Sequence, residues 1–315
     1  MGRHNERRDV CMAKTAFIFP GQGAQYIGMG RDFYDQCPES AAMFDLAQQA
    51  TGLPVKEMCF EENDKLGITE YTQICLLTTE LAMLKAVEAK GVYPQVTAGL
   101  SLGEYAALVA AGKLDAAQAM ILVRKRGIYM QEAVPTGGAM SAVLGLDNAV
   151  VEKICQETPG LVELANYNCP GQIVISGEQS AVEAAGEALK AAGAKRVAPL
   201  KVSGPFHSSM LAEAGHRLAQ ALEDADFKDS PIPYVCNTEA RYVDDVSPIK
   251  DLLIRQVSSS VRWEQSIRQM IAQGVDTFIE IGPGKTLCGF MKRIDRNVKA
   301  INIDKYEDLK KLEEI

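Results

Sequence analysis

The residue of this sequence best placed to do chemistry is Ser101, which lies in the sequence GLSLG at 99–103. One glycine stands two positions before it and another stands two positions after it. A short apolar run at 96–99 precedes it and a helical pattern at 104–112 follows it. In a strand-turn-helix context this spacing predicts a nucleophile elbow, in which a sharp turn projects the serine oxygen over the start of the helix. Backbone N–H groups and the helix dipole favour a developing oxyanion there. The alternative is a serine that only caps the helix.

A serine nucleophile needs a base, because its hydroxyl is almost wholly protonated at neutral pH. The chain has three histidines. His4 lies in a charged N-terminal stretch, and His216 lies in a polar helical pattern typical of a solvated surface. His207 lies in the turn-rich sequence SGPFHS after a predicted strand, and α/β folds place catalytic groups in such loops. We therefore predict that His207 is the base, and the alternative is a loop histidine bonded to backbone.

No acidic partner for this histidine stands out in the sequence. Asp244, Asp245 and Asp251 occupy plausible loops, where carboxylates are usually only solvated. A backbone carbonyl can fix the tautomer of a histidine equally well. The group that orients His207 therefore stays open at this point.

Composition excludes several other classes of protein. The 315 residues are 47% hydrophobic, enough for a sizeable core and about two domains. A net charge of -8 argues against nucleic acid as a general partner, because phosphate binding needs a basic face. The eight cysteines are scattered singly, which predicts no metal site and suits a reducing compartment. No secretory signal and no membrane helix of roughly 18 apolar residues is expected, so we predict a cytoplasmic protein.

Strands and helices alternate along the first part of the chain, which indicates α/β architecture. The same texture resumes after residue 204, and the residues after about 304 are expected to be helical and solvated. In these two parts we expect strands at 15–20 and 96–99, near Tyr234 and at 275–281, and helices at 41–50, 71–91, 104–112 and 116–132.

A different pattern occupies residues 138–203. The order strand, helix, strand, strand, helix, strand is that of a ferredoxin-like unit. We therefore predict a small domain, 138–203, inserted between two parts of a large domain, 13–137 and 204–315. The small domain's expected elements are strands at 140–146, 161–167, 172–176 and 196–202 and helices at 149–157 and 180–192.

Two glycine-rich segments look like nucleotide-binding motifs but depart from them. The segment that begins at Gly21 has Tyr26 where the third glycine of a dinucleotide motif belongs. The segment that begins at Gly282 ends like a P-loop, yet Ile279 stands where the first glycine belongs. A turn at a strand end or a close backbone approach accounts for both segments better.

Six motifs in order resemble the malonyl-CoA:acyl carrier protein transacylases of bacterial fatty acid synthesis and related polyketide acyltransferase domains. The resemblance runs from Thr15 to about Ile303 and implies an α/β-hydrolase-like large domain with a ferredoxin-like small one. The motifs are FPGQGAQ (19–25), GLSLGEY (99–105), RGIYMQEAVP (126–135), NYNCPGQIVISG (166–177), GPFHS (204–208) and IGPGKTL (281–287).

The resemblance implies a ping-pong transfer of malonyl from malonyl-CoA to the thiol of acyl carrier protein. Ser101 would carry the malonyl group, and His207 would act as base and then as acid. The implied enzyme is a monomer that needs no cofactor and no metal, because malonyl-CoA is a substrate. The alternatives are a serine thioesterase, a polyketide-type acyltransferase with another acyl preference, and a non-catalytic subunit that binds carrier protein.

Further roles follow from the same resemblance. The backbone N–H groups of Gln22 and Leu102 would form the oxyanion hole. Arg126 would hold the free carboxylate of malonate, which suits the planar guanidinium group. The backbone carbonyl of Gln256 would orient the catalytic histidine, and Asn166 would line the site.

Two positions beside the expected site bear on its acyl preference. Leu100 replaces a histidine that is usual before the nucleophile, so a side-chain donor is missing there. Phe206 resembles the malonyl-preferring members, in which a bulky ring crowds a 2-methyl branch. Elsewhere, a basic cluster is a candidate contact for an acidic carrier protein, and a solvated face is the alternative. The cluster consists of Lys285, Lys292 and Arg293.

Overall fold

The computed structural model describes residues 14–315. His4 and the polar N-terminal stretch, on which the expectation of no secretory signal rests, lie outside these residues. Between residues 14 and 315, no helix is both long enough and apolar enough to cross a bilayer.

A six-stranded, mostly parallel sheet forms the centre of the larger body. Its strands are β1 (Thr15–Phe19), β2 (Val96–Gly99), β7 (Tyr234–Val235), β8 (Tyr242–Val243), β9 (Thr277–Ile281) and β10 (Lys299–Ile303). Their order is β10-β9-β1-β2-β7-β8, and only β8 runs antiparallel to its neighbour. All five residues of β1 are buried, as expected for a parallel strand covered on both faces. The predicted α/β architecture is confirmed, and the structure adds that the sheet is mostly parallel.

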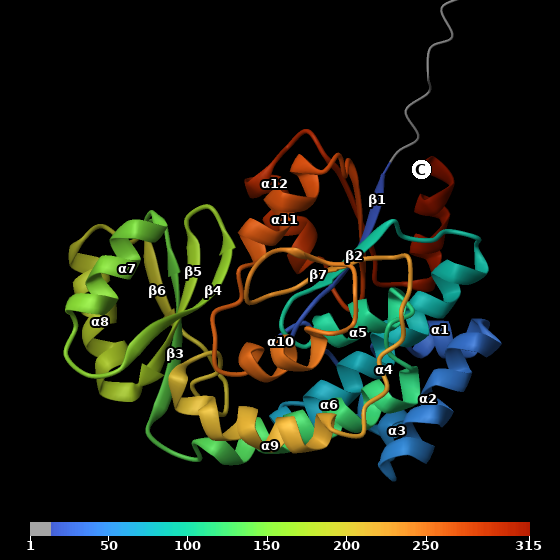
Figure 1. Cartoon of the computed structure of the whole chain (residues 1–315), viewed down its shortest axis with the longest axis horizontal. Coiled ribbons are helices and arrows are strands. Elements are labelled where there is room, and N and C mark those ends of the chain that lie inside the picture. Colours follow the sequence, from blue (N-terminus) through green and yellow to red (C-terminus); the bar gives the residue numbers. More distant parts are fainter. Residues whose placement is uncertain (1–13) are drawn as a thin grey trace, which may run out of the picture.

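Helices cover both faces of this sheet (Figure 1). Alternate residues of β1 point to opposite faces, so Phe17 and Phe19 join one core cluster while Ala16 and Ile18 join another. The first cluster is built with α1 (Arg31–Gln36), α2 (Pro38–Thr51), α3 (Val55–Phe60), α4 (Thr69–Ala89), α5 (Gly103–Ala110), α6 (Ala116–Ala133), α9 (Ala212–Leu222) and α10 (Ile249–Gln256). The second is built with α11 (Trp263–Ala272) and α12 (Thr286–Ile294).

The helix α4 is central to the first layer. Residues 72–84 of this helix are all buried, and it packs against both α2 and α6. A helix that is buried on every side lies inside the protein rather than on its surface. It therefore lies in the interior of the larger body, with α2, α5 and α6 packed around it.

A four-stranded antiparallel sheet forms the smaller body, seen at the left of Figure 1. Its strands lie in the order β4-β5-β3-β6, and its two helices pack on one face. The elements are β3 (Gly138–Leu144), α7 (Asn148–Glu157), β4 (Val162–Cys169), β5 (Gln172–Glu178), α8 (Gln179–Ala191) and β6 (Arg196–Pro199).

Two expectations about elements were wrong. The last strand of the smaller sheet ends at Pro199 rather than at residue 202, because the Val202 N–H turns back to the Leu200 carbonyl. The C-terminal segment is the 3-10 helix η2 (Tyr306–Glu314), and it is not merely solvated. Leu309 and Leu312 are three residues apart, lie on one side of this helix and are buried in the main core.

This packing predicts that Leu309→Ala lowers the free energy of unfolding by about 2 to 5 kcal/mol, the usual cost of a buried leucine. Lys310→Ala is the matched control, because Lys310 is exposed in the same helix. Urea unfolding followed by circular dichroism measures both changes. Equal stabilities for the two variants would mean that the C-terminal helix does not contribute to the core.

Candidate active site

Ser101 lies in a sharp turn between β2 and α5. Its φ is 52°, a left-handed conformation that costs free energy for a residue with a side chain. A Cβ on Gly99 would overlap the backbone of Gly103, and a Cβ on Gly103 would overlap the carbonyl of Phe19. Both glycines of the motif are therefore required by close backbone packing around the serine.

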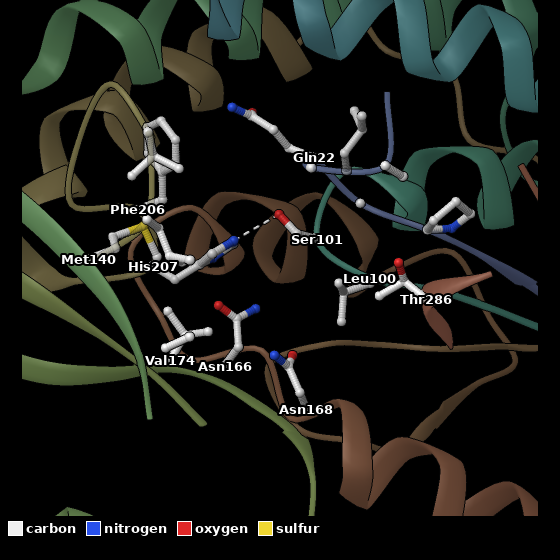
Figure 2. Close-up of a pocket in the computed structure, with 18 of the residues that line it drawn as sticks. Gln22, Leu100, Ser101, Met140, Asn166, Asn168, Val174, Phe206, His207 and Thr286 are labelled. Atoms are coloured by element: carbon white, nitrogen blue, oxygen red, sulfur yellow. Dashed lines mark hydrogen bonds between the residues drawn. The ribbon is translucent and has the colours of Figure 1, made fainter. Parts of the chain in front are cut away.

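His207 faces the serine from the loop after β6. Its Nε2 lies 2.7 Å from the Ser101 Oγ (Figure 2). Its Nδ1 lies 2.9 Å from the carbonyl oxygen of Gln256. Because a carbonyl can only accept, Nδ1 carries the proton and leaves Nε2 free to accept the serine hydroxyl. Burial and the nearby charge of Arg126 lower the pKa of His207 to about 4. The imidazole is therefore neutral at neutral pH and ready to take a proton.

An asparagine that the sequence analysis missed holds the elbow in place. The Oδ1 of Asn237 accepts from the backbone N–H of Ser101 at 2.7 Å. Its Nδ2 donates to the carbonyl of Gly99, also at 2.7 Å. One buried amide thus ties both sides of the strained turn to the loop after β7.

Arg126 projects from α6 into the same site and is only 1% exposed. Its guanidinium donates to Oε1 of Gln73 at 2.7 Å, to Oε1 of Gln256 at 2.9 Å and to the Ser101 Oγ at 3.1 Å. All three acceptors are uncharged, and none of the salt bridges found in residues 14–315 includes this arginine. A buried cation without a contacting carboxylate therefore lies directly beside the nucleophile.

The backbone donors beside the serine are unoccupied. The N–H groups of Gln22 and Leu102 have no hydrogen-bond acceptor among residues 14–315. A Cβ on Gly21 would lie 2.6 Å from the Leu100 carbonyl, so the loop after β1 packs directly on the elbow. Figure 2 shows Gln22 next to Ser101 as a result. Two free donors at the start of α5 are suited to an oxyanion.

A cavity of about 260 Å³ opens in front of these groups. Its lining is mostly apolar and comes from the smaller sheet and from loops and helices of the larger body (Figure 2). Asn166 and Asn168 reach it from β4, and the Asn168 Oδ1 is buried with no partner in residues 14–315. Leu100 lies below the serine in that view and Phe206 beside the histidine. The sequence analysis did not single out Asn168, although it stands two residues from Asn166 on the same strand face.

The other candidates lie away from this cavity. His216 is exposed on α9 and lies 3.5 Å from Glu213, as expected for a solvated histidine. Asp251 pairs with Arg255 at the surface and does not contact His207. In the basic cluster, Arg293 donates to the Gln172 side chain, so this residue links the two bodies.

The glycine-rich segment at Gly282 has a structural explanation. This glycine has a φ of 149°, and a Cβ there would lie 2.6 Å from the ring of Pro20. Both segments therefore fit the predicted turn at a strand end or close backbone approach, since Gly21 lies against the Leu100 carbonyl and Gly282 against a proline ring.

Comparison with known proteins places this geometry in a family. Residues 16–306 match the family described as acyl transferase domain. The chain is 47% identical over 304 residues to the malonyl CoA-acyl carrier protein transacylase of Bacillus subtilis, covering 95% of this chain and 96% of that one.

Solved structures agree with this assignment. The MCAT of Streptococcus pneumoniae superposes with a TM-score of 0.92 at 49% identity, covering 96% of this chain and 100% of that one. A malonyl-transacylase in complex with its type II PKS acyl-carrier protein gives 0.93 at 39% identity, with the same coverage. The chain therefore belongs to the acyl transferase domain family, among the malonyl CoA-acyl carrier protein transacylases.

Proposed function

We propose that this protein transfers a malonyl group from malonyl-CoA to the phosphopantetheine thiol of acyl carrier protein in fatty acid biosynthesis. The observation that carries the proposal is the buried Arg126 within hydrogen-bond distance of a serine that is paired with a histidine. Relatives at 44% and 47% identity carry the name of this activity. A structural neighbour solved with its acyl-carrier protein supports the carrier as partner.

The first half of the reaction loads the serine. The Oγ of Ser101 attacks the thioester carbonyl of malonyl-CoA while Nε2 of His207 takes its proton. The N–H groups of Gln22 and Leu102 stabilise the oxyanion that forms on the carbonyl oxygen. The carbon–sulfur bond then breaks, and the leaving thiolate of coenzyme A receives the proton from His207. The Gln256 carbonyl stabilises the imidazolium that exists between these two events.

The second half returns the proton along the same path. The thiol of acyl carrier protein gives its proton to His207 and attacks the malonyl ester. The ester oxygen leaves and takes the proton back, which restores Ser101. Residues of the chain handle every proton and leaving group, so the proposed mechanism includes no metal and no cofactor.

Arg126 is the proposed source of malonyl selectivity. Its guanidinium is buried and lies beside the serine, so a carboxylate on the acyl group would complete a buried charge pair. Leu100 offers no polar group to that carboxylate, and Phe206 narrows the cavity against a branched acyl chain. Asn166 lines the same cavity and is proposed to contact the substrate.

The same observation weighs against the alternative functions. A thioesterase for fatty acyl groups would need an apolar pocket where this buried cation lies. A polyketide-type acyltransferase with another preference would have to accommodate its acyl branch beside Phe206. A non-catalytic carrier-binding subunit has no need of the 2.7 Å serine–histidine contact.

We also infer the finer architecture and the state of the protein. Residues 138–203 form an inserted ferredoxin-like domain, supported by the element order and by four antiparallel strands in the order β4-β5-β3-β6. Residues 13–137 and 204–315 form one α/β-hydrolase-like domain. The protein is a cytoplasmic monomer. All the residues of the site come from one chain, and the seven described cysteines are buried and free, which suits a reducing compartment.

The lowered pKa of His207 predicts an unusual pH profile for serine reactivity. A neutral fluorophosphonate should label Ser101 at a constant rate down to about pH 5, and the rate should fall as the pH drops through the histidine pKa of about 4. The reason is that burial keeps the imidazole unprotonated at pH values below the ordinary histidine pKa of 6.5, so Nε2 can still accept the serine proton. Circular dichroism checks that the protein is folded at each pH. A midpoint near 6.5 would mean that the base is solvated.

Malonyl-CoA alone should add one malonyl mass to the protein, at Ser101. Ping-pong exchange requires this intermediate, and it should persist in water until holo acyl carrier protein removes it. Intact-protein mass spectrometry measures both steps, with Ser101→Ala as the control. Full labelling of that variant would remove the serine from the mechanism, and rapid loss of the label without carrier would favour the thioesterase.

Arg126→Ala should cost malonyl transfer on the order of 3 to 5 kcal/mol, a factor of hundreds to thousands, because it leaves a buried carboxylate unpaired. Transfer of the uncharged acetyl group should change little or improve. Leu100→His should alter malonyl transfer far less than the loss of the arginine does. Kinetics with malonyl-CoA and acetyl-CoA on both variants decide the matter. Equal losses for both substrates in Arg126→Ala would make the arginine structural.

A further inference from the structure

Glu104 is a buried carboxyl group that the mechanism above does not use. It lies at the start of α5, three residues after the nucleophile, and is 1% exposed. Its Oε2 accepts from Nε2 of Gln256 at 2.6 Å and from the backbone N–H of Asn237 at 3.4 Å. Burial raises the pKa of Glu104 to about 8, although these hydrogen bonds and the charge of Arg126 act in the opposite direction.

One amide connects this carboxyl group to the arginine of the site. The side chain of Gln256 donates from Nε2 to Glu104 and accepts at Oε1 from Arg126, at 2.6 and 2.9 Å. Among residues 14–315, two acidic side chains act on the charge of Arg126, Tyr105 and Glu104, and Glu104 is the carboxyl group of the two. In the unloaded site, the buried cation and the buried carboxyl group therefore face each other across a single amide.

A substrate with its own carboxylate disturbs this arrangement. This step rests on the proposed function, in which Arg126 binds the malonyl carboxylate. One buried positive charge can then neutralise only one of two carboxylates, and two like charges close together in a buried site cannot both stay ionised. The substrate carboxylate is in direct contact with the guanidinium, whereas Glu104 reaches it only through Gln256.

We propose that Glu104 takes up a proton from solvent when the malonyl carboxylate binds Arg126 and releases it when the malonyl group leaves. Glu104 does not touch the substrate. It sets the affinity of the site for an anionic acyl group because a charged Glu104 and the malonyl carboxylate compete for the one positive charge of Arg126. Malonyl therefore binds more tightly when the Glu104 carboxyl group is neutral.

Among the described titratable groups around Glu104, only Glu104 itself changes charge between about pH 6.5 and 9. Arg126 stays charged over this range, because arginine is not deprotonated in proteins. His207 stays neutral, since its pKa is about 4. Burial raises the pKa of each remaining titratable neighbour above its ordinary value, so the two tyrosines stay neutral and the cysteine keeps its proton up to about pH 9. These neighbours are Tyr105 on α5, Tyr234 on β7 and Cys236 after it.

The test compares single-turnover acylation of Ser101 by malonyl-CoA and by acetyl-CoA between about pH 6.5 and 9. For the unaltered protein, the half-saturating concentration of malonyl-CoA should rise about tenfold between pH 7 and pH 9, as a carboxyl group with a pKa of about 8 becomes charged. The half-saturating concentration of acetyl-CoA should not rise in this way, because the acetyl group is uncharged. The two substrates share the coenzyme A portion, so any titration that affects this portion cancels.

Glu104→Gln is the matched variant. Its amide oxygen can still accept from Gln256, and its side chain is neutral at every pH. It should bind malonyl-CoA with an affinity that no longer depends on pH and that exceeds the unaltered protein's above about pH 8. The same pH dependence in both proteins, or the same dependence for both substrates, would overturn the proposal.

A second measurement does not depend on the variant's folding. In weakly buffered solution at about pH 8, malonylation of the unaltered protein should take up more protons from solvent than acetylation does, because both reactions release the same coenzyme A thiol and only malonylation protonates Glu104. Equal proton balance for the two reactions would overturn the proposal. These outcomes differ from a failure of the proposed function, in which malonyl-CoA leaves no malonyl group on Ser101 at any pH.

Discussion

The groups of this site meet at one buried residue, Gln256, and their geometry depends on it. Its backbone carbonyl holds Nδ1 of His207, so the other ring nitrogen faces the serine. Its side chain accepts from Arg126 and donates to Glu104 and to the Ser101 carbonyl. A glutamine can do this because its amide donates at one end and accepts at the other. A carboxylate here could not donate to Glu104 or to the serine carbonyl.

The two reacting residues of this site have strained backbone conformations. Ser101 and His207 both have positive φ, at 52° and 59°. Such conformations persist only where the surrounding structure holds them. The hydrogen bonds of Asn237 and the packing of Gly99 and Gly103 hold the turn at Ser101, and the Gln256 carbonyl holds the ring of His207. Helix α4, which is buried from Thr72 to Leu84, packs against α5, the helix that begins directly after this turn.

Much of the fold could be predicted from local patterns, and the exceptions have a common cause. Long helices such as α4 and α6 and the buried strand β1 have clear periodicity or apolar runs. The two-residue strand β8 is too short to show any period, and the tail was misjudged because Leu309 and Leu312 stand among charged residues. The burial of these two leucines depends on contacts of the C-terminal helix with β10, α1 and α4, and a short stretch of sequence does not contain these elements together.

For the site, the sequence by itself determined the elbow at Ser101, because a turn this tight requires glycine on both sides. The sequence also indicated His207 as the base, because only this one of the three histidines follows a predicted strand in a turn-rich loop. Only the tertiary structure decided how the charges are arranged. Asn237 and Gln256 lie 136 and 155 residues from the serine that they hold, and no spacing rule connects amides at such separations. The role of Glu104 was hidden for the same reason. An acidic residue in the first turn of a helix looks solvated until burial and the position of Arg126 are known.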